Sequence, residues 1–303
     1  MLLKMIPPRR LVLSGGGIRV VSFVGALKVL EEKGYLSKIK EVCGVSAGAF
    51  LGFLVASGYP VKKIESLIID LDFGIIRHIT PEAFLGFPES FGLDDGERFV
   101  KFLESIFRVV LKVDPGLTLG DFAKMNRPNQ VKFRCWATDL NSSTIREFSG
   151  EKTPGVRIIE ALRASMALPF YFTPSIDPIT GHMLTDGGVQ GNLPLHHLRD
   201  DECEDSLSLA FSSKVKDSID KSIPQDLMEF VNSLFSSLKN SRNNTSLNKW
   251  SHKIIYVDGK NYPSWNFEAS REDRKMLMEW GSEAVHSWLL NPPSRNTERR
   301  HSF

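Results

Sequence analysis

The chain opens with the same arrangement twice: a short apolar run, a glycine-containing turn, and then a helical pattern. Leu11–Ser14 leads through glycines to apolar residues at helical spacing over Val21–Lys33, and Glu41–Gly44 leads to a small-residue helix over Ala47–Ser57. A further amphipathic helix is expected over Val61–Leu71. Short strands that alternate with helices through short links are typical of a parallel sheet with helices on both faces. We therefore expect an α/β fold of three layers, α/β/α, with a mostly parallel central sheet.

The later part of the chain mixes regular and irregular segments. Asp72–Leu93 is rich in Phe and Gly and contains two prolines, so we expect no regular element there. Lys239–Asn248 is a polar loop, and Ser270–Asp273 resembles a capping box. The other elements expected are helices over Gly96–Val110, Val156–Met166, Gln225–Leu238 and from Ser270 to about Leu290, and strands over Lys132–Thr138, Thr144–Phe148, Leu207–Phe211 and Ile254–Val257.

The composition of the 303 residues limits the class of protein. With 42% hydrophobic and 24% charged residues, the chain is an ordinary globular one, which excludes collagen-like, low-complexity and wholly disordered classes. The 38 Lys+Arg against 36 Asp+Glu give a formal net charge of +2, which argues against a protein that coats nucleic acid. The three cysteines form no disulfide or metal pattern, and we expect no metal site. The sparse cysteines and the lack of an export signal or long apolar run predict a cytoplasmic protein.

Gly44-Val45-Ser46-Ala47-Gly48 has the GxSxG pattern of a nucleophile elbow. It lies between an expected strand and an expected helix, which is the context that such an elbow requires. A sharp turn there projects the serine hydroxyl, and Gly44 and Gly48 leave room where a Cβ atom would clash. The helix that begins at Ala47 also points its positive end at this place. Ser46 is therefore a candidate nucleophile.

A triple glycine, Gly15-Gly16-Gly17-Ile18-Arg19, joins the first expected strand to the first helix. Backbone N–H groups of such a loop can converge on an anion. One interpretation is an oxyanion hole for a tetrahedral intermediate. Another is a dinucleotide phosphate loop, although Val20 replaces the third glycine of that fingerprint and the ribose-binding acid would have to be Glu41. A tight turn without a ligand is a third.

Asp186-Gly187-Gly188 follows a short expected strand end at His182–Thr185. An Asp-Gly-Gly sequence is most often a turn. A carboxylate held on a tight turn can also act as a general base. Because 140 residues separate Asp186 from Ser46, only the fold can bring the two side chains together.

The order GGGxR, GxSxG and DGG, in its strand context, resembles the patatin-like phospholipase family. Two further blocks are similar to that family: Ala164–Phe170, a small-residue helix end with a proline, and Asn192–Pro194 after the DGG motif. Ser14 and Val20 depart from the family's glycine loop, which usually has Asp and Gly there. The resemblance implies a catalytic domain over residues 9–210. Residues 211–290 would complete the same domain, and residues 291–303 are expected to form a disordered tail.

The resemblance also implies a Ser–Asp dyad, which needs no cofactor. Ser46 would attack an ester carbonyl, Asp186 would take its proton, and the N–H groups of Gly15 to Gly17 would hold the oxyanion. Arg19 would orient the glycine loop or meet a lipid phosphate. The substrate would be a phospholipid or other acyl lipid reached by transient contact with a membrane surface. No nucleic-acid partner is implied.

Two alternatives remain open at this stage. One is an α/β-hydrolase-type esterase, in which His196 or His197 is the base. The other is a lipid-binding protein without catalysis on a patatin-like fold. The apolar residues of two segments could form an acyl-chain pocket or a lid, or could simply pack in the core. They are Phe73, Ile75, Ile76, Phe84, Leu85, Phe87 and Phe91, and Leu168–Phe172.

Overall fold

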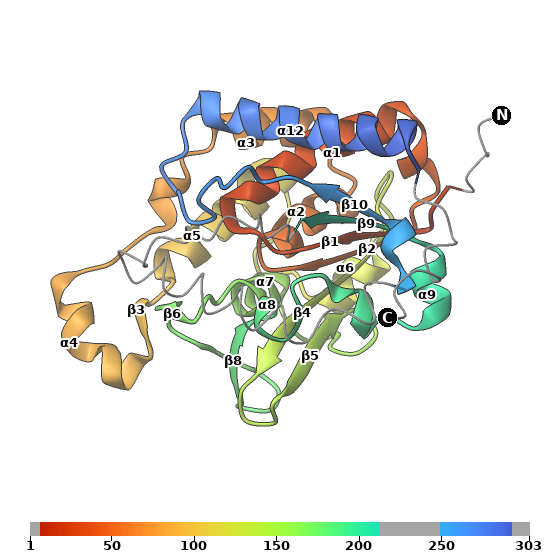
Figure 1. Ribbon diagram of the computed structural model, residues 1–303. Helices are drawn as coiled ribbons and strands as arrows, with labels where there is room; N and C mark the ends of the chain where they lie inside the picture. Colours follow the sequence, from red (N-terminus) through yellow and green to blue (C-terminus); the bar gives the residue numbers. More distant parts are fainter. Residues whose placement is uncertain (1–6, 213–248, 293–303) are drawn as a thin grey trace, which may run out of the picture.

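A computed structural model describes residues 7–212 and 249–292 of the chain. Within these residues the central sheet has eight strands in the order β10-β9-β1-β2-β4-β8-β7, with β5 paired to β4 (Figure 1). Neighbours from β10 to β4 are parallel, and β5, β8 and β7 are antiparallel additions. The expected mostly parallel sheet is confirmed. The strands are β1 (Arg10–Leu13), β2 (Glu41–Val45), β4 (Lys132–Asp139), β5 (Thr144–Ser149), β7 (Ser175–Ile176), β8 (Met183–Asp186), β9 (Ser206–Phe211) and β10 (Ile254–Val257).

Helices flank this sheet, and Figure 1 shows α12 lying along α1. A short 3₁₀ turn, Gly17–Val20, leads into α1, and another, Pro194–His197, follows α8. The helices are α1 (Val21–Glu32), α2 (Ala47–Ala56), α3 (Val61–Asp70), α4 (Pro81–Ser90), α5 (Glu97–Ser105), α6 (Leu119–Lys124), α7 (Ile158–Ser165), α8 (Gly188–Gly191), α9 (Asp200–Glu204) and α12 (Arg271–Leu290).

Both faces of the sheet are buried, because successive side chains of a strand point to opposite sides. In β1, Leu11 and Leu13 join the larger hydrophobic core with residues of α1, α2 and α12. Val12 between them joins a smaller cluster around Trp136 on the other face. All four side chains are fully buried. Burial on both faces explains why these strands are continuous apolar runs.

Glycines allow α1 and α12 to cross at close range. A Cβ atom at Gly25 of α1 would lie 1.8 Å from the Met278 carbonyl oxygen, and one at Gly281 would lie 1.7 Å from the Ser22 carbonyl oxygen. The expected capping box opens α12: Ser270 and Asp273 each accept from the other's backbone amide. Residues near the end of the chain therefore join the same helix layer as α1.

The prediction for Asp72–Leu93 is wrong. The segment contains a 3₁₀ turn at Phe73–Ile76, the helix α4, and a short strand β3 (Gly92–Asp94) that pairs with β6 (Phe170–Phe172). Pro81 stands at the first turn of α4, where a missing N–H costs nothing, and Pro88 lies inside the helix, two residues before its end. The helix expected to reach Val110 widens after Ser105 into a π-helical turn, Ile106–Leu111.

The other early strands and helices agree with the expectation to within two residues, as do the Thr144–Phe148 hairpin partner and the strand at Ile254–Val257. The helix expected over Gln225–Leu238, the loop over Lys239–Asn248 and the tail from 293 to 303 lie outside the described residues.

Candidate active site

Ser46 sits at a strained turn between β2 and α2. Its backbone has φ +56° and ψ −136°, a conformation that a residue with a side chain rarely adopts. The Ser46 amide donates to the Ser165 hydroxyl at 3.0 Å, and that hydroxyl donates to the Trp136 carbonyl at 2.7 Å. The last residue of α7 thus holds the turn in place. The serine side chain is almost wholly buried, with 7% of its surface exposed.

The two glycines of the GxSxG pattern are required by close backbone contacts. A Cβ atom at Gly44 would lie 2.4 Å from the Gly48 carbonyl oxygen. One at Gly48 would lie 2.3 Å from the Ser14 carbonyl oxygen, at the end of β1. The elbow is therefore pressed against the glycine loop that follows β1, and its glycines have the steric role that the pattern predicted.

Asp186 ends a strand, β8, that runs toward Ser46 in the direction opposite to β2. β5 covers one edge of β4, so β2 and β8, which pair with adjoining parts of β4, share its other edge. β2 ends at Val45 opposite Trp136, and the antiparallel β8 ends at Asp186 opposite Ala137. Consecutive strand residues are only about 3.3 Å apart. Ser46, which directly follows Val45, and Asp186 therefore lie at one junction where two strand ends meet.

The Asp186 carboxylate is buried and oriented by the backbone. Its Oδ1 accepts from the Gly188 amide at 2.7 Å, and 4% of the residue is exposed. The Thr138 hydroxyl donates to the Asp186 carbonyl at 3.0 Å. A Cβ atom at Gly187 would lie 2.4 Å from the Trp136 carbonyl oxygen, so the DGG turn can pass β4 only as glycine.

The glycine loop is fixed to this junction by Asn192. The Gly15 amide donates to the Asn192 carbonyl at 3.0 Å, and Asn192 Nδ2 donates to the Gly15 carbonyl at 2.9 Å. A Cβ atom at Gly15 would lie 2.9 Å from Ser46 Cβ. The Gly15 amide is thus engaged. Gly16 and Gly17 open a 3₁₀ turn, whose first N–H groups have no partner within the turn.

Gly17 and Arg19 tie the loop to the C-terminal part of the chain. Gly17 has φ +57°, and a Cβ atom there would lie 2.0 Å from the Ser264 carbonyl oxygen. The Arg19 guanidinium stacks over the Phe211 ring at 4.8 Å, and its Nε donates to the Gly16 carbonyl at 3.5 Å. Burial lowers the pKa of Arg19. Arg19 thus connects the glycine loop to Phe211 at the end of β9.

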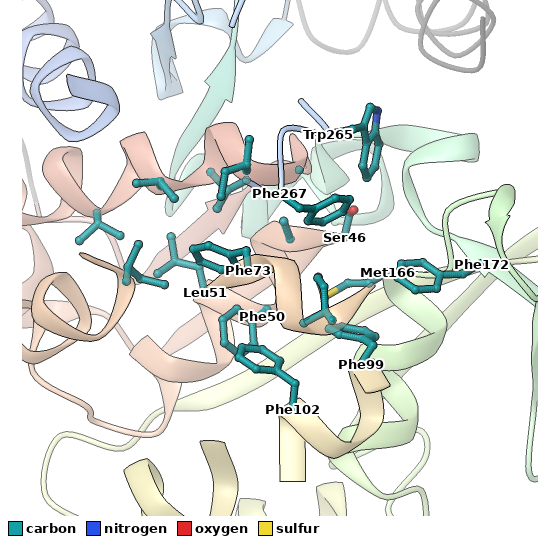
Figure 2. A pocket seen from close by; sticks show the side chains of 18 residues that line it. Ser46, Phe50, Leu51, Phe73, Phe99, Phe102, Met166, Phe172, Trp265 and Phe267 are labelled. Atoms are coloured by element: carbon teal, nitrogen blue, oxygen red, sulfur yellow. The ribbon is translucent and has the colours of Figure 1, made fainter. Parts of the chain in front are cut away.

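An apolar cavity opens beside Ser46. Figure 2 shows the Ser46 hydroxyl among aromatic side chains of the lining. The cavity and its open mouth together contain about 770 Å³ of empty space. Ser46 carries the one hydroxyl among the described lining residues. The aromatic residues of the lining are Phe50, Phe73, Phe99, Phe102, Phe172, Trp265 and Phe267.

The predicted apolar residues have different surroundings. Leu168 and Tyr171 pack in the hydrophobic core, and Phe87 is half-buried. Phe73, Ile76 and Phe172 line the cavity. Ile75, Phe84, Leu85, Phe91 and Phe170 are instead exposed large apolar side chains.

Comparisons with known proteins identify the family. The family model described as "Patatin-like phospholipase" matches residues 11–199, which span all three motifs. The chain belongs to the patatin-like phospholipase family. Relatives include the uncharacterized protein YqhO of Bacillus subtilis (strain 168), 25% identical over 295 residues, with 92% of this chain and 97% of YqhO covered. The probable lipid hydrolase 463L of Invertebrate iridescent virus 6 is 28% identical over 188 residues, or 62% of each chain.

The patatin-like phospholipase domain-containing protein 6 of Homo sapiens is 29% identical over 184 residues, which are 61% of this chain and 12% of that protein. Among solved structures, VipD from Legionella pneumophila has a TM-score of 0.61 at 19% identity and covers 95% of this chain, with 67% of VipD matched. The type III effector ExoU has a TM-score of 0.52 at 16% identity, with 95% of this chain and 53% of ExoU covered. These structures share the patatin-like fold.

His196 and His197 lie away from the cavity of this patatin-like site. The His197 ring packs at a tilt against Trp136 at 5.9 Å and against His196 at 4.1 Å, on the sheet face opposite α1 and α2. A Cβ atom at Gly191 would lie 1.9 Å from His196 Nε2, so that ring fills the space beside Gly191. Burial lowers the pKa of His196 and, with a contribution from His196, lowers that of His197 to about 3.

Glu41 is not placed to bind a ribose. It begins β2, at the opposite end of the parallel strands from the glycine loop, where Arg10 Nε and Arg134 Nη2 donate to Glu41 Oε2 at 2.5 and 2.8 Å. Glu202 joins the same cluster through Arg134 at 2.8 Å. Glu41 therefore does not supply the ribose-binding acid that the dinucleotide interpretation of the loop requires.

The described residues contain no group of three or more His, Cys, Asp or Glu side chains that could hold a metal ion. Among the helices of 7–212 and 249–292, none has the length and apolar character needed to cross a bilayer.

Proposed function

We propose that the protein hydrolyses fatty acyl esters of phospholipids, or of related acyl lipids, through an acyl-enzyme on Ser46. The observation that supports this most is the strand junction: a strained, buried serine faces an apolar cavity while a buried carboxylate arrives at the same point. Relatives named as phospholipase and lipid hydrolase support the same class of reaction. We place the protein in the cytoplasm, in transient contact with membranes.

In the first step Ser46 Oγ bonds to the ester carbonyl carbon, and Asp186 accepts the hydroxyl proton. The carbonyl π electrons move onto its oxygen. The amides of Gly16 and Gly17, together with the positive end of α2, would stabilise this oxyanion. The Gly15 amide is not assigned to the oxyanion, because it already donates to Asn192. The proposed oxyanion hole therefore has one donor fewer than the three glycine amides expected from the sequence.

Collapse of the oxyanion breaks the ester C–O bond, and Asp186 returns the proton to the departing alcohol. Water then bonds to the acyl carbon while Asp186 takes one of its protons. When the second tetrahedral intermediate collapses, the acid leaves and Ser46 recovers the proton from Asp186. The sequence of steps consumes one water and needs no cofactor.

The cavity favours a fatty acyl chain as the group that is bound. Its lining is almost wholly aliphatic and aromatic, so a polar acyl group would lose its hydration without gaining partners there. Apolar chains gain about 0.8 kcal/mol for each buried CH₂ group. We therefore expect turnover to rise with acyl-chain length until the cavity is full.

The test is covalent labelling with a fluorophosphonate probe, combined with hydrolysis of a phosphatidylcholine. Wild type should be labelled on Ser46, and Ser46→Ala should be unlabelled and inactive. Asp186→Asn should lower kcat by about 10²–10⁴-fold, the usual contribution of a positioned base. His196→Ala and His197→Ala should keep most of the activity.

Each alternative has its own outcome in this experiment. Loss of turnover in a histidine variant, with Asp186→Asn active, would support an α/β-hydrolase-type esterase. Folded wild type that is neither labelled nor active would support a lipid-binding protein without catalysis.

A further inference from the structure

The helix α4 (Pro81–Ser90) has apolar side chains but no buried residue. Phe84 is 61% exposed, Leu85 is 86% exposed, and Phe91, which ends the helix, is 51% exposed. A surface helix normally turns such residues toward the core. Figure 1 shows α4 projecting from the body of the protein. Phe84, Leu85 and Phe91 are therefore mostly exposed rather than packed against the core.

The base of this projection is firmly attached. β3, which follows α4, pairs in parallel with β6. The wholly buried Asp94 at the end of β3 accepts from the His78 amide at 2.5 Å and from the Gly96 amide at 2.8 Å. One carboxylate thus joins the chain just before α4 to the chain just after β3. The helix is held in place at its base while its apolar side chains remain outside.

The exposed surface continues to the wall of the Ser46 cavity. The Phe87 ring lies 6.3 Å from the ring of Phe170, which is 38% exposed. Two residues further along β6, Phe172 is buried and lines the cavity. We call Phe84, Leu85, Phe91 and Phe170 the α4 patch. Through Phe87 and β6, α4 is thus connected to the wall of the cavity.

Charge and area indicate what covers the patch. The run Phe84–Pro88 is uncharged, and α4 contains Glu82 and Glu89 but no Lys or Arg, so the helix itself offers no attraction to an anionic surface. Arg77, near the base, is paired with Glu268 at 3.2 Å. The patch exposes roughly 400 Å² of apolar surface, well below the ~800 Å² per partner of a stable protein interface. Phe and Leu side chains at an exposed helix are suited to the interfacial region of a bilayer.

We propose that the α4 patch docks the protein on an electrically neutral phospholipid bilayer, with the mouth of the Ser46 cavity next to the lipid. The purpose of docking rests on the proposed function. Binding to the bilayer itself requires no turnover and can be measured separately. Apolar burial rather than charge drives the contact, so binding changes little with salt.

The experiment measures sedimentation of the full chain, as Ser46→Ala, with phosphatidylcholine vesicles at 0.05 and 0.5 M salt. The double variant Phe84→Gln/Leu85→Gln should lower the partition coefficient at least about tenfold, because each side chain loses its apolar burial. The matched control Ile179→Gln/Leu290→Gln removes two apolar side chains that are 59% and 80% exposed elsewhere. The control should bind as the parent does, and salt should change binding less than about threefold.

Hydrolysis of a water-soluble short-chain ester, measured without the Ser46→Ala change, separates docking from catalysis. The α4 double variant should keep this activity and lose activity on vesicle lipids. An inactive wild type that still sediments through the α4 patch would refute the proposed function and leave the docking proposal standing. Docking is overturned if the parent does not bind neutral vesicles, if the α4 variant binds equally well, or if binding needs anionic lipid. It is also overturned if mass measurement shows that the α4 changes separate a dimer.

Discussion

Asn192 holds Gly15 through both polar groups of that residue's backbone. Its carbonyl accepts the Gly15 N–H at 3.0 Å, and its side-chain Nδ2 donates to the Gly15 carbonyl at 2.9 Å. Gly15 in turn lies against Ser46, where an added Cβ atom would come within 2.9 Å of Ser46 Cβ. Asn192, which follows the DGG turn in the chain, therefore sets the distance between the glycine loop and Ser46.

Asn192→Ala should lower kcat by at least about tenfold with little change in KM, since a displaced loop no longer stabilises the transition state. The loss of one hydrogen bond should reduce the free energy of unfolding by only about 1 kcal/mol. Gln190→Ala is the control, because its side chain also donates to a backbone carbonyl, that of Ser143, at 2.8 Å. Equal effects of both substitutions on kcat would contradict the role of Asn192.

Gly17→Ala should reduce the free energy of unfolding by about 3 kcal/mol or more, from left-handed strain plus the overlap with the Ser264 carbonyl. Gly34→Ala isolates the strain, because Gly34 has φ +78° and no atom within 4 Å of an added Cβ. It should cost about 1–2 kcal/mol. Urea unfolding measures both. Similar losses would mean that the Ser264 contact is unimportant.

Gly25→Ala should destabilise the crossing of α1 and α12 by about 1–3 kcal/mol, since the added Cβ would overlap the Met278 carbonyl. Gly86 is a helical glycine with nothing within 4 Å of an added Cβ. Gly86→Ala should therefore raise stability by about 0.5–1 kcal/mol through helix propensity. Thermal unfolding of the two variants should move in opposite directions, and a neutral Gly25→Ala would argue against close helix contact.

His197 should make the protein less stable in mild acid. The unfolded chain takes up a proton near the ordinary histidine pKa of about 6.5, whereas burial lowers the folded pKa to about 3. The unfolded state binds more protons between these values, so the free energy of unfolding falls as the pH decreases from about 6.5 toward about 3. Between pH 7.5 and pH 5, the free energy of unfolding should fall by about 1–2 kcal/mol less in His197→Gln than in wild type. Urea unfolding at the two pH values measures this difference. Parallel pH profiles would contradict this.

Local chemistry made the three motifs readable from sequence. Gly44 meets its steric contact, Gly48, within the same turn, and a strand followed by a glycine and a helix is visible in a window of about fifteen residues. The contact of Gly48 with the Ser14 carbonyl joins two separate segments and has no such local pattern. The strand–helix units near Ser46 could be predicted for the same reason. The position of Asp186 came from a resemblance, because no local pattern relates it to Ser46.

Three features could not be predicted from the sequence. The end-to-end meeting of β2 and β8 depends on the register of each with β4, and sequence alone does not state a register. The short helix α4 was missed because its apolar residues face no core, so the usual helical stripe has no meaning there. Asn192 was noticed only as part of a block, since nothing nearby in sequence reveals its contact with Gly15.

Because β2 and β8 share one edge of β4, the register of both strands with β4 sets the relative position of Ser46 and Asp186. A slip of β8 by a single residue would place Thr185 opposite Ala137 and turn the carboxylate to the far side of the sheet. The loops between the elements of the intervening chain can lengthen or shorten in evolution, provided that this alignment survives.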